Sequence, residues 1–164
     1  MSPLSRLLVI ETGYALQQNG LLALGERFCD IGKTVGLIGG TKRGSLHTDQ
    51  AFIGTMADGP GAASPALFGY TLPNIPLAEA AGVFGLVGPV YAVFDKDNPL
   101  KSAEDEARRL LVMQKQEQEQ KNLNLMLACE FDHYRDEQEQ EKLSVTLTVV
   151  EHNANSNPGL SKVE

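Results

Sequence analysis

The sequence has little of three things: aromatic residues, cysteine and positive charge. Aromatics make up 6% of the 164 residues and Trp is absent, so a core must be built from Leu, Val, Ile and Ala. The two cysteines, Cys29 and Cys129, lie far apart and outside any Cys-x-x-Cys pattern, which indicates neither a disulfide framework nor a zinc site. Lys and Arg number 14 against 21 Asp and Glu, and this acidic balance argues against nucleic acid as a partner.

A long hydrophobic run is also lacking, since a bilayer span needs about 20 apolar residues. The apolar start of the chain follows Arg6 and is interrupted by Glu11, without a convincing cleavage site for a secretory leader. We therefore expect a helix of the fold here, no membrane partner and a cytoplasmic location. A hydrophobic fraction of 42% is typical of a globular chain. The length suits one domain over 1–152, followed by a flexible Asn- and Ser-rich tail over 153–164.

Helix and strand signals are spread along the whole chain. Ser2-Pro3 combines a capping residue with a proline at the first helical position, and predicts a helix that ends near Gly20. Ser64-Pro65 repeats this signal and predicts a short helix through Tyr70. Apolar spacing predicts further helices over 43–57 and 75–84. Ser102 forms a near capping box with Asp105 and predicts the start of another helix. Apolar runs predict strands at 34–40, 90–94, 123–131 and 143–152.

The order of these elements predicts an α/β fold. We expect a three-layer arrangement with a mostly parallel sheet and helices on both faces. The last strand alternates apolar and polar residues, as a half-exposed edge strand does, and is expected to be antiparallel. Two polar stretches, 114–121 and 135–142, are expected to be solvated helix ends or loops.

The most specific segment is SPALFGYTLPNIPLAEAAGVFGLVGP, residues 64–89. It closely resembles a segment of the β-ketoacyl synthases, which have the thiolase-like fold. In that family a Ser-Pro helix, a Leu-Pro-Asn break, a helix and a Gly-Leu-x-Gly-Pro turn lead into the strand before the nucleophile. Weaker similarity extends over 1–152, so the resemblance implies a truncated, N-terminal half-domain. The family's first strand, which lies mid-sheet, has no match: either neighbouring strands close the gap or a second chain fills it.

The resemblance places the family's nucleophilic cysteine at Asp97. A carboxylate is a far poorer acyl carrier than a thiolate, and no cysteine lies nearby in the sequence. The small residues of the family's turn are replaced by Lys96, Asn98 and Pro99. The two His and the Lys of the family's condensing site belong to its C-terminal half, for which this chain has no residues. The sequence therefore predicts no catalytic residue, no cofactor and no metal site.

The resemblance also indicates a dimer strand. In the family, the strand before the nucleophile pairs with its twin across a two-fold axis. Its counterpart in this chain consists of Val90, Tyr91, Ala92, Val93 and Phe94. We expect these residues to pair antiparallel in a homodimer, or in a heterodimer with a full-length ketosynthase, and an acyl carrier protein is a further candidate partner.

A glycine-rich turn offers a second candidate site, argued from the residues alone. The turn after the first predicted strand contains Gly39, Gly40, Thr41 and Gly44, and its backbone N–H groups can hold an anion. It does not fit the Walker A pattern, so a structural turn is the default and phosphate binding the alternative.

The remaining polar candidates favour structural interpretations. Cys129, Asp132 and His133 include metal-binding residue types, but Cys129 lies in an apolar strand, where cysteine is usually an inert hydrophobe. Asp95–Asp97 fits a solvated turn, although it occupies the place of the family's active site. His47 and His152 have no partners nearby in the sequence and are expected at the surface.

Three functions remain open at this stage. The first is a non-catalytic, ketosynthase-like protein that acts as a dimerising or accessory subunit of a polyketide- or fatty-acid-type condensing system. The alternative is a small acyl- or nucleotide-binding domain, or an enzyme of unrelated chemistry, that reuses the scaffold, because a fold does not fix a function. A decayed protein without activity is the third.

Overall fold

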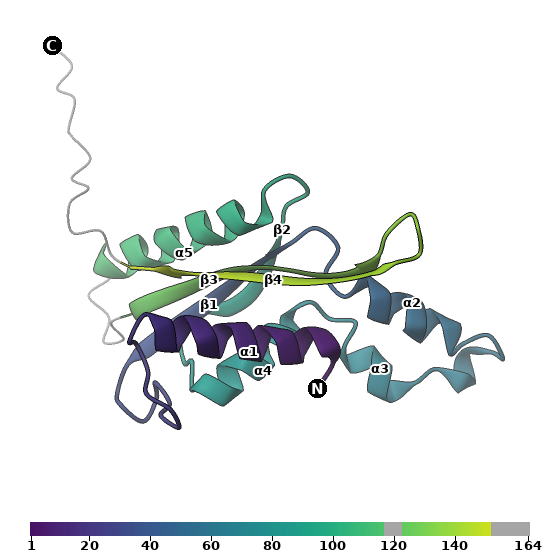
Figure 1. Ribbon diagram of the computed structural model, residues 1–164, viewed down its shortest axis with the longest axis horizontal. Coiled ribbons are helices and arrows are strands. Elements are labelled where there is room, and N and C mark those ends of the chain that lie inside the picture. The colour runs from purple at the N-terminus through teal and green to yellow at the C-terminus, as the bar shows by residue number, and fades with distance from the viewer. Residues whose placement is uncertain (117–122, 152–164) are drawn as a thin grey trace, which may run out of the picture.

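The computed structural model describes residues 1–116 and 123–151 (Figure 1). Their elements, in order, are α1 (Pro3–Gln18), β1 (Thr34–Thr41), α2 (Leu46–Gly54), the 3-10 turn η1 (Pro60–Ala62), α3 (Pro65–Gly69), α4 (Asn74–Phe84), β2 (Val90–Phe94), α5 (Pro99–Gln116), β3 (Leu123–Arg135) and β4 (Glu141–Val150). The predicted tail over 153–164, His152 and most of the polar stretch 114–121 lie outside the described residues. No described helix combines the length and the apolar character needed to cross a membrane.

The described strands form one four-stranded sheet in the order β2-β1-β3-β4. β1 is parallel to β2 and to β3, whereas β4 is antiparallel to β3 and forms an edge. The pairing of β1 with β3 runs from Thr34 opposite Leu123 to Gly40 opposite Glu130. The sequence left open how the sheet closes without the family's first strand. In the described chain, the neighbouring strands pair directly with each other.

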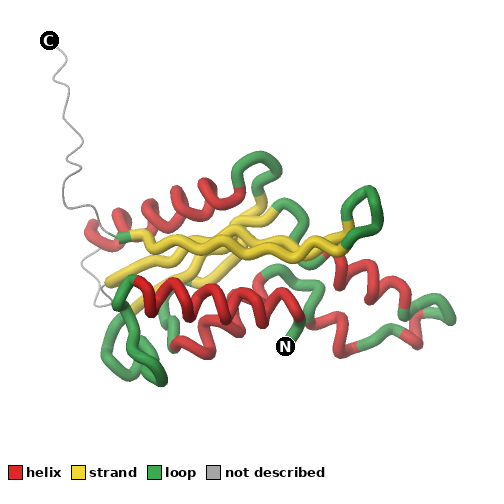
Figure 2. The backbone as a smooth tube through the Cα atoms, in the orientation of Figure 1, coloured by secondary structure: helices red, strands yellow, loops and turns green. Residues whose placement is uncertain are grey.

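Helices cover both faces of this sheet, which confirms the predicted α/β class (Figures 1 and 2). Successive residues of β1 point to opposite faces, so Leu37 packs with α1 and α4 on one side and Ile38 with α5 on the other. The larger core contains Leu4, Leu8, Leu16, Leu77 and Phe131. The smaller one contains Ala103, Ala107, Leu111 and Met126.

Local signals placed most helix starts correctly. The hydroxyl of Ser2 accepts a hydrogen bond from the N–H of Ser5 at 3.1 Å, and the hydroxyl of Ser64 accepts one from the N–H of Leu67 at 3.3 Å. The prediction that α5 starts at Ser102 is wrong, because the helix already begins at Pro99. Proline suits a first helical position, and the side chain of Ser102 donates to Asp95 just before the helix.

The glycines of β1 allow close packing rather than flexibility. A Cβ added to Gly40 would lie 1.8 Å from the carbonyl oxygen of Pro99, at the start of α5. A Cβ added to Gly39 would lie 2.5 Å from the ring of Phe131. A larger residue at either position would push an element off the sheet.

Beyond the last residue paired with β1, β3 continues with β4 as a two-stranded ribbon. The ribbon comprises residues 131–135 and 141–145. It reaches past the sheet toward α2, which contacts β3 (Figure 2). The N–H of His133 donates to the carbonyl of Gly44 at 2.8 Å and so joins the ribbon to the turn after β1.

Candidate functional site

The predicted anion-binding turn holds a carboxylate that belongs to the chain itself. Oδ1 of Asp132 accepts hydrogen bonds from the hydroxyl of Thr41 at 2.6 Å and from the N–H groups of Arg43 at 2.7 Å and Gly44 at 2.8 Å. Gly44 has a φ of 57°, a left-handed conformation that turns its N–H inward. Because Asp132 is buried and occupies these donors, an external anion would have to displace it.

Gly39 and Gly40 take no part in this cradle. They lie within β1, where they pair with both neighbouring strands. Their role in the described structure is the close packing described above.

The turn after β2, where the resemblance placed a nucleophile position, is a local hydrogen-bonded structure. The carboxylate of Asp95 accepts from the hydroxyl of Ser102 and from the N–H groups of Asn98 at 2.9 Å and Asp97 at 2.7 Å. These bonds, the Ser102 hydroxyl first, lower the pKa of Asp95 to about 2. Asp97 itself is exposed. The turn therefore fixes the start of α5.

Neither cysteine is placed as a reactive thiol. Cys129 is fully buried in the larger core, and burial raises the pKa of its thiol far above the ordinary value. Cys29 lies in the loop between α1 and β1, where its Sγ donates to Oδ1 of Asp30 at 3.3 Å.

A cluster of two histidines and a glutamate lies where α2 meets the ribbon. His133 is 1% exposed, and its Nε2 lies 2.8 Å from Oε1 of Glu141. The ring of His47, from α2, stacks on the ring of His133 with centroids 4.3 Å apart. His47, expected at the surface and without partners nearby in the sequence, has a side chain that is 24% exposed, and the fold brings its Nε2 to 4.0 Å from Oε2 of Glu141.

Electrostatics in this cluster lower the pKa values of His47 and Glu141. Burial, followed by the neighbouring His133, lowers the pKa of His47. The hydrogen bond from His133 is the main cause that lowers the pKa of Glu141. Nδ1 of His133 is buried and has no hydrogen-bond partner among the described residues.

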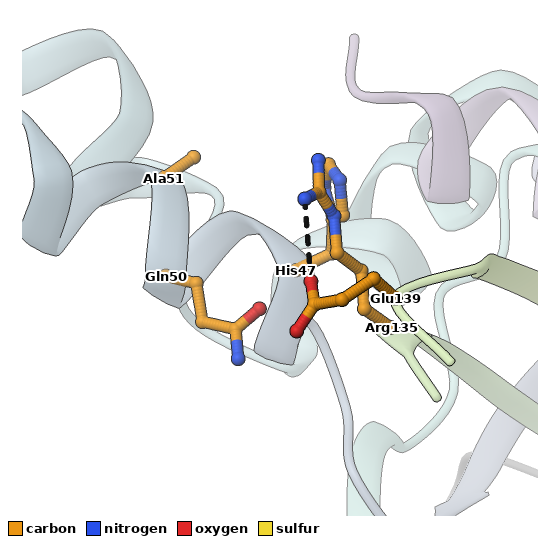
Figure 3. A pocket seen from close by; sticks show the side chains of 5 residues that line it. All are labelled: His47, Gln50, Ala51, Arg135 and Glu139. Carbon is orange, nitrogen blue, oxygen red and sulfur yellow. Dashed lines mark ion pairs between the residues drawn. The ribbon is translucent and has the colours of Figure 1, made fainter. Parts of the chain in front are cut away.

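A cavity of about 300 Å³ opens beside His47. Its other lining residues are Gln50 and Ala51 from α2, Arg135 from the end of β3, and Glu139 from the hairpin turn (Figure 3). The guanidinium of Arg135 pairs with Glu139 at 3.6 Å, as the dashed line in Figure 3 marks.

A second cavity, of about 350 Å³, lies at the carboxyl ends of β1 and β2. Its lining includes Lys42 and Arg43 from the turn, Asp49 from α2, and Phe94, whose side chain is 74% exposed. Burial raises the pKa of Asp49, and one of its carboxylate oxygens has no partner among the described residues. Ligands of parallel α/β sheets commonly bind at this end of the strands.

β2 forms one edge of the sheet. Leu37 donates to the carbonyl of Pro89 at 2.9 Å and Asp95 donates to that of Thr41 at 3.1 Å, so odd-numbered residues of this segment face β1. The backbone groups of Val90, Ala92 and Phe94 therefore face outward. Among them, the N–H of Ala92 donates to Oδ1 of Asn74 at 2.8 Å.

The structure separates Asp132 from His133, which are neighbours in the sequence. It brings His133 together with His47 and Glu141, which are not its neighbours in the sequence. Successive side chains leave a strand on opposite faces, so Asp132 binds the turn while His133 faces α2. The spacing of His133 by two from the buried Phe131 was a signal that it points inward. His47 and Glu141 had no such signal, because only tertiary packing brings them to His133.

Comparison with known proteins supports the fold. No protein-family model matches this sequence, and no curated protein matches it. Among solved structures, a β-ketoacyl synthase from Burkholderia phymatum STM815 is similar, with a TM-score of 0.57 and 19% sequence identity. The match covers 80% of this chain and 30% of the synthase, so the chain spans less than a third of that protein's length. The α/β fold expected from the sequence is thus shared with part of a β-ketoacyl synthase.

Proposed function

We propose that this chain is a non-catalytic, ketosynthase-like subunit that pairs through the open edge of β2, with itself or with a full-length ketosynthase. The observation that carries the proposal is that edge. Val90 and Ala92 are half-buried apolar residues whose backbone groups face outward, and Phe94 beside them is largely exposed. An apolar edge strand is a template for another strand, and natural proteins cover or pair such edges.

Two other surfaces of the described chain are less suited to pairing. The outer side of α5 has ion pairs between residues three or four apart, among them Lys101–Asp105 at 2.6 Å and Arg108–Glu104 at 2.9 Å. Such pairs are typical of a solvated helix face. The opposite sheet edge, β4, begins with the exposed charges of Glu141 and Lys142, which discourage strand addition.

The chemistry of the turn after β2 supports a role without condensation. Acyl transfer of the ketosynthase type needs a thiolate, and the aligned position has Asp97. The carboxylate of Asp95 beside it is engaged in holding the start of α5. A chain that lacks the nucleophile but keeps an open edge can pair without catalysing condensation. This combination favours an accessory subunit of a polyketide- or fatty-acid-type condensing system.

The oligomeric state tests this proposal directly. Proline at Ala92 removes an outward N–H and with it the hydrogen bond to Oδ1 of Asn74. Proline at Val93 would instead remove an N–H that faces β1 and would damage the sheet itself. We expect a dimer by light scattering coupled to size exclusion, and a monomer for Ala92→Pro. The matched control, Ala92→Ser, keeps the N–H and should remain dimeric.

A monomeric wild-type chain that also fails to bind a partner would contradict the proposal. The partner is identified by a pull-down with the tagged chain from its native cells, with Ala92→Pro as the negative control. Enrichment of a ketosynthase that the proline variant loses supports the heterodimer. A folded Ala92→Pro protein that still dimerises and retains the same partner would show that β2 is not the interface.

The cavity at the ends of β1 and β2 favours a second candidate, a small acyl-ligand-binding domain. The exposed ring of Phe94 offers an apolar contact, and Lys42 and Arg43 offer positive charge for a phosphorylated carrier group. A ligand that binds only the native state raises the melting temperature. Stabilisation by acyl-CoA, with a smaller effect of CoA alone and none of ATP, would support this function over the first.

A further inference from the structure

The cluster of His47, His133 and Glu141 is not used by the pairing edge or by the second cavity. The three side chains come from α2, β3 and β4, which meet only through tertiary packing. One ligand-type atom from each residue can be chosen so that all three lie within 4.8 Å of one another. We propose that these residues bind a divalent transition-metal ion, with zinc as the best fit.

The donor set matches the chemistry of such an ion. Imidazole nitrogen and carboxylate oxygen are ligands that zinc prefers, whereas calcium and magnesium prefer oxygen alone. Three protein ligands leave at least one coordination position open to water or to a small ligand.

The geometry of the cluster requires only a side-chain adjustment. A tetrahedral ion with bonds of about 2.0–2.1 Å holds its ligands roughly 3.3 Å apart. Nε2 of His133 and Oε1 of Glu141, hydrogen-bonded at 2.8 Å, have to separate by about 0.5 Å to reach that spacing, while His47 Nε2 and Glu141 Oε2 lie 4.0 Å apart. His47 therefore has to unstack from His133 and swing toward Glu141. Both moving side chains, those of His47 and Glu141, are partly exposed and can do so.

His133 is the fixed member of the site. Its ring is buried, and its backbone N–H is held by the carbonyl of Gly44. Its Nδ1 has no partner among the described residues, although buried polar atoms usually have one. The imidazole is thus placed in advance, and Nε2, the nitrogen that faces Glu141, is its ligand atom in the proposed site.

The surrounding charges accommodate a cation. Glu141 provides a negative charge inside the site, and the one positive group beside His47 in the cavity, Arg135, is paired with Glu139 (Figure 3). Arg43 nearby lies 4.5 Å over the ring of Tyr134. The cavity beside His47 supplies room for the water or small anion that completes the coordination (Figure 3).

The site is tested by titrating the tag-free full chain with zinc chloride. Binding is measured by calorimetry and by the change in melting temperature. We expect one zinc ion per chain and a higher melting temperature. His47→Ala and Glu141→Gln should each weaken binding at least tenfold. Both positions are partly exposed, so these variants should stay folded, which circular dichroism verifies. Cobalt(II) gives a second readout, because tetrahedral coordination with imidazole ligands produces visible d–d absorption that His47→Ala should abolish.

Controls separate this site from other zinc-binding groups of the chain. Cys29→Ala removes the partly accessible thiol, His152→Ala removes the histidine outside the described residues, and Glu139→Gln removes a neighbouring carboxylate. All three should bind zinc as the wild type does. Absence of zinc binding to the wild type would overturn the proposal. Zinc binding that His47→Ala and Glu141→Gln leave unchanged would also overturn it and would show an adventitious ion only.

Discussion

Oδ1 of Asp132 lies 2.8 Å from the backbone nitrogen of Gly44, at the centre of a turn that the sequence marked as a place for an anion. The anion in that place is a side chain of β3. One hydrogen-bonded carboxylate therefore ties the turn after β1 to the ribbon, and it positions α2 above the same ribbon. The architecture around both candidate cavities depends on this contact.

Replacing Asp132 should consequently destabilise the protein. Asp132→Ala leaves the hydroxyl of Thr41 and the N–H of Arg43 without their acceptor, while the N–H of Gly44 keeps only the hydroxyl oxygen of Thr41 at 2.6 Å. We expect the free energy of unfolding to fall by about 2–4 kcal/mol. Unfolding in urea measures this free energy. Asp97→Ala removes an exposed carboxylate and should change it by no more than about 0.5 kcal/mol.

The same variant tests whether the turn retains affinity for anions. With the carboxylate gone, formate or acetate can occupy its place, and a ligand that binds only the folded state raises the melting temperature. Asp132→Ala should therefore gain more stability from formate than the wild type does. Equal gains in the two proteins would mean that the turn collapses without its own carboxylate.

Gly40 is expected to be intolerant of any side chain. A Cβ there would lie 1.8 Å from the carbonyl oxygen of Pro99, so Gly40→Ala should force α5 away from β1 and cost about 3 kcal/mol or more. Gly54→Ala is the matched control, because its Cβ would meet no atom within 4 Å. Gly54 is the last residue of α2, where helix propensity has less effect than in the interior, so this change should alter stability by no more than about 0.5 kcal/mol. A Gly40→Ala protein as stable as the wild type would contradict the close approach.

Acid should reveal the contribution of Asp95. The pKa of Asp95 is about 2 in the folded protein against 3.8 for the free side chain, chiefly because of the Ser102 hydroxyl. A lowered folded-state pKa adds stability above the unfolded-state value, and this stability is lost as the pH falls from about 4 toward 2. Asp95→Asn lacks this contribution, so its melting temperature should be lower than that of the wild type at pH 6.

The difference between these two proteins should shrink as the pH falls from 4 to 2.5. Asp97→Asn serves as the control for a neighbouring carboxylate and should follow the wild type at every pH. A gap between wild type and Asp95→Asn that stays constant down to pH 2.5 would exclude the assigned role of the Asp95 carboxylate.

No acyl group should be transferred to the chain. Cys129 is buried with a raised pKa, and the turn after β2 contains Asp97 and no cysteine, so incubation with acyl-CoA or acyl carrier protein thioesters should leave the intact mass unchanged. A full-length ketosynthase, acylated in parallel, controls for the reagents. An acyl adduct that disappears in Cys29→Ala would assign a nucleophile to the loop before β1.

Much of the architecture followed from local chemistry. Ser2-Pro3 and Ser64-Pro65 indicated helix starts, because a hydroxyl and a preset φ favour a first turn wherever they occur. The bounds of β2 and the edge character of β4 likewise followed from apolar patterning. The start of α5 was placed too late, since Ser102 was interpreted as a cap although Pro99 had the same signal as Pro3.

The sequence by itself determined the α/β class and the presence of a buried β1, because each depends on the identity of residues or on short periodicities. Only the tertiary structure decided that β1 pairs directly with β3, that Asp132 fills the turn, and that His47, His133 and Glu141 converge. These relationships join residues far apart in the chain. Their distances are set by how the strands register and how α2 packs on the ribbon, and no local pattern encodes that packing.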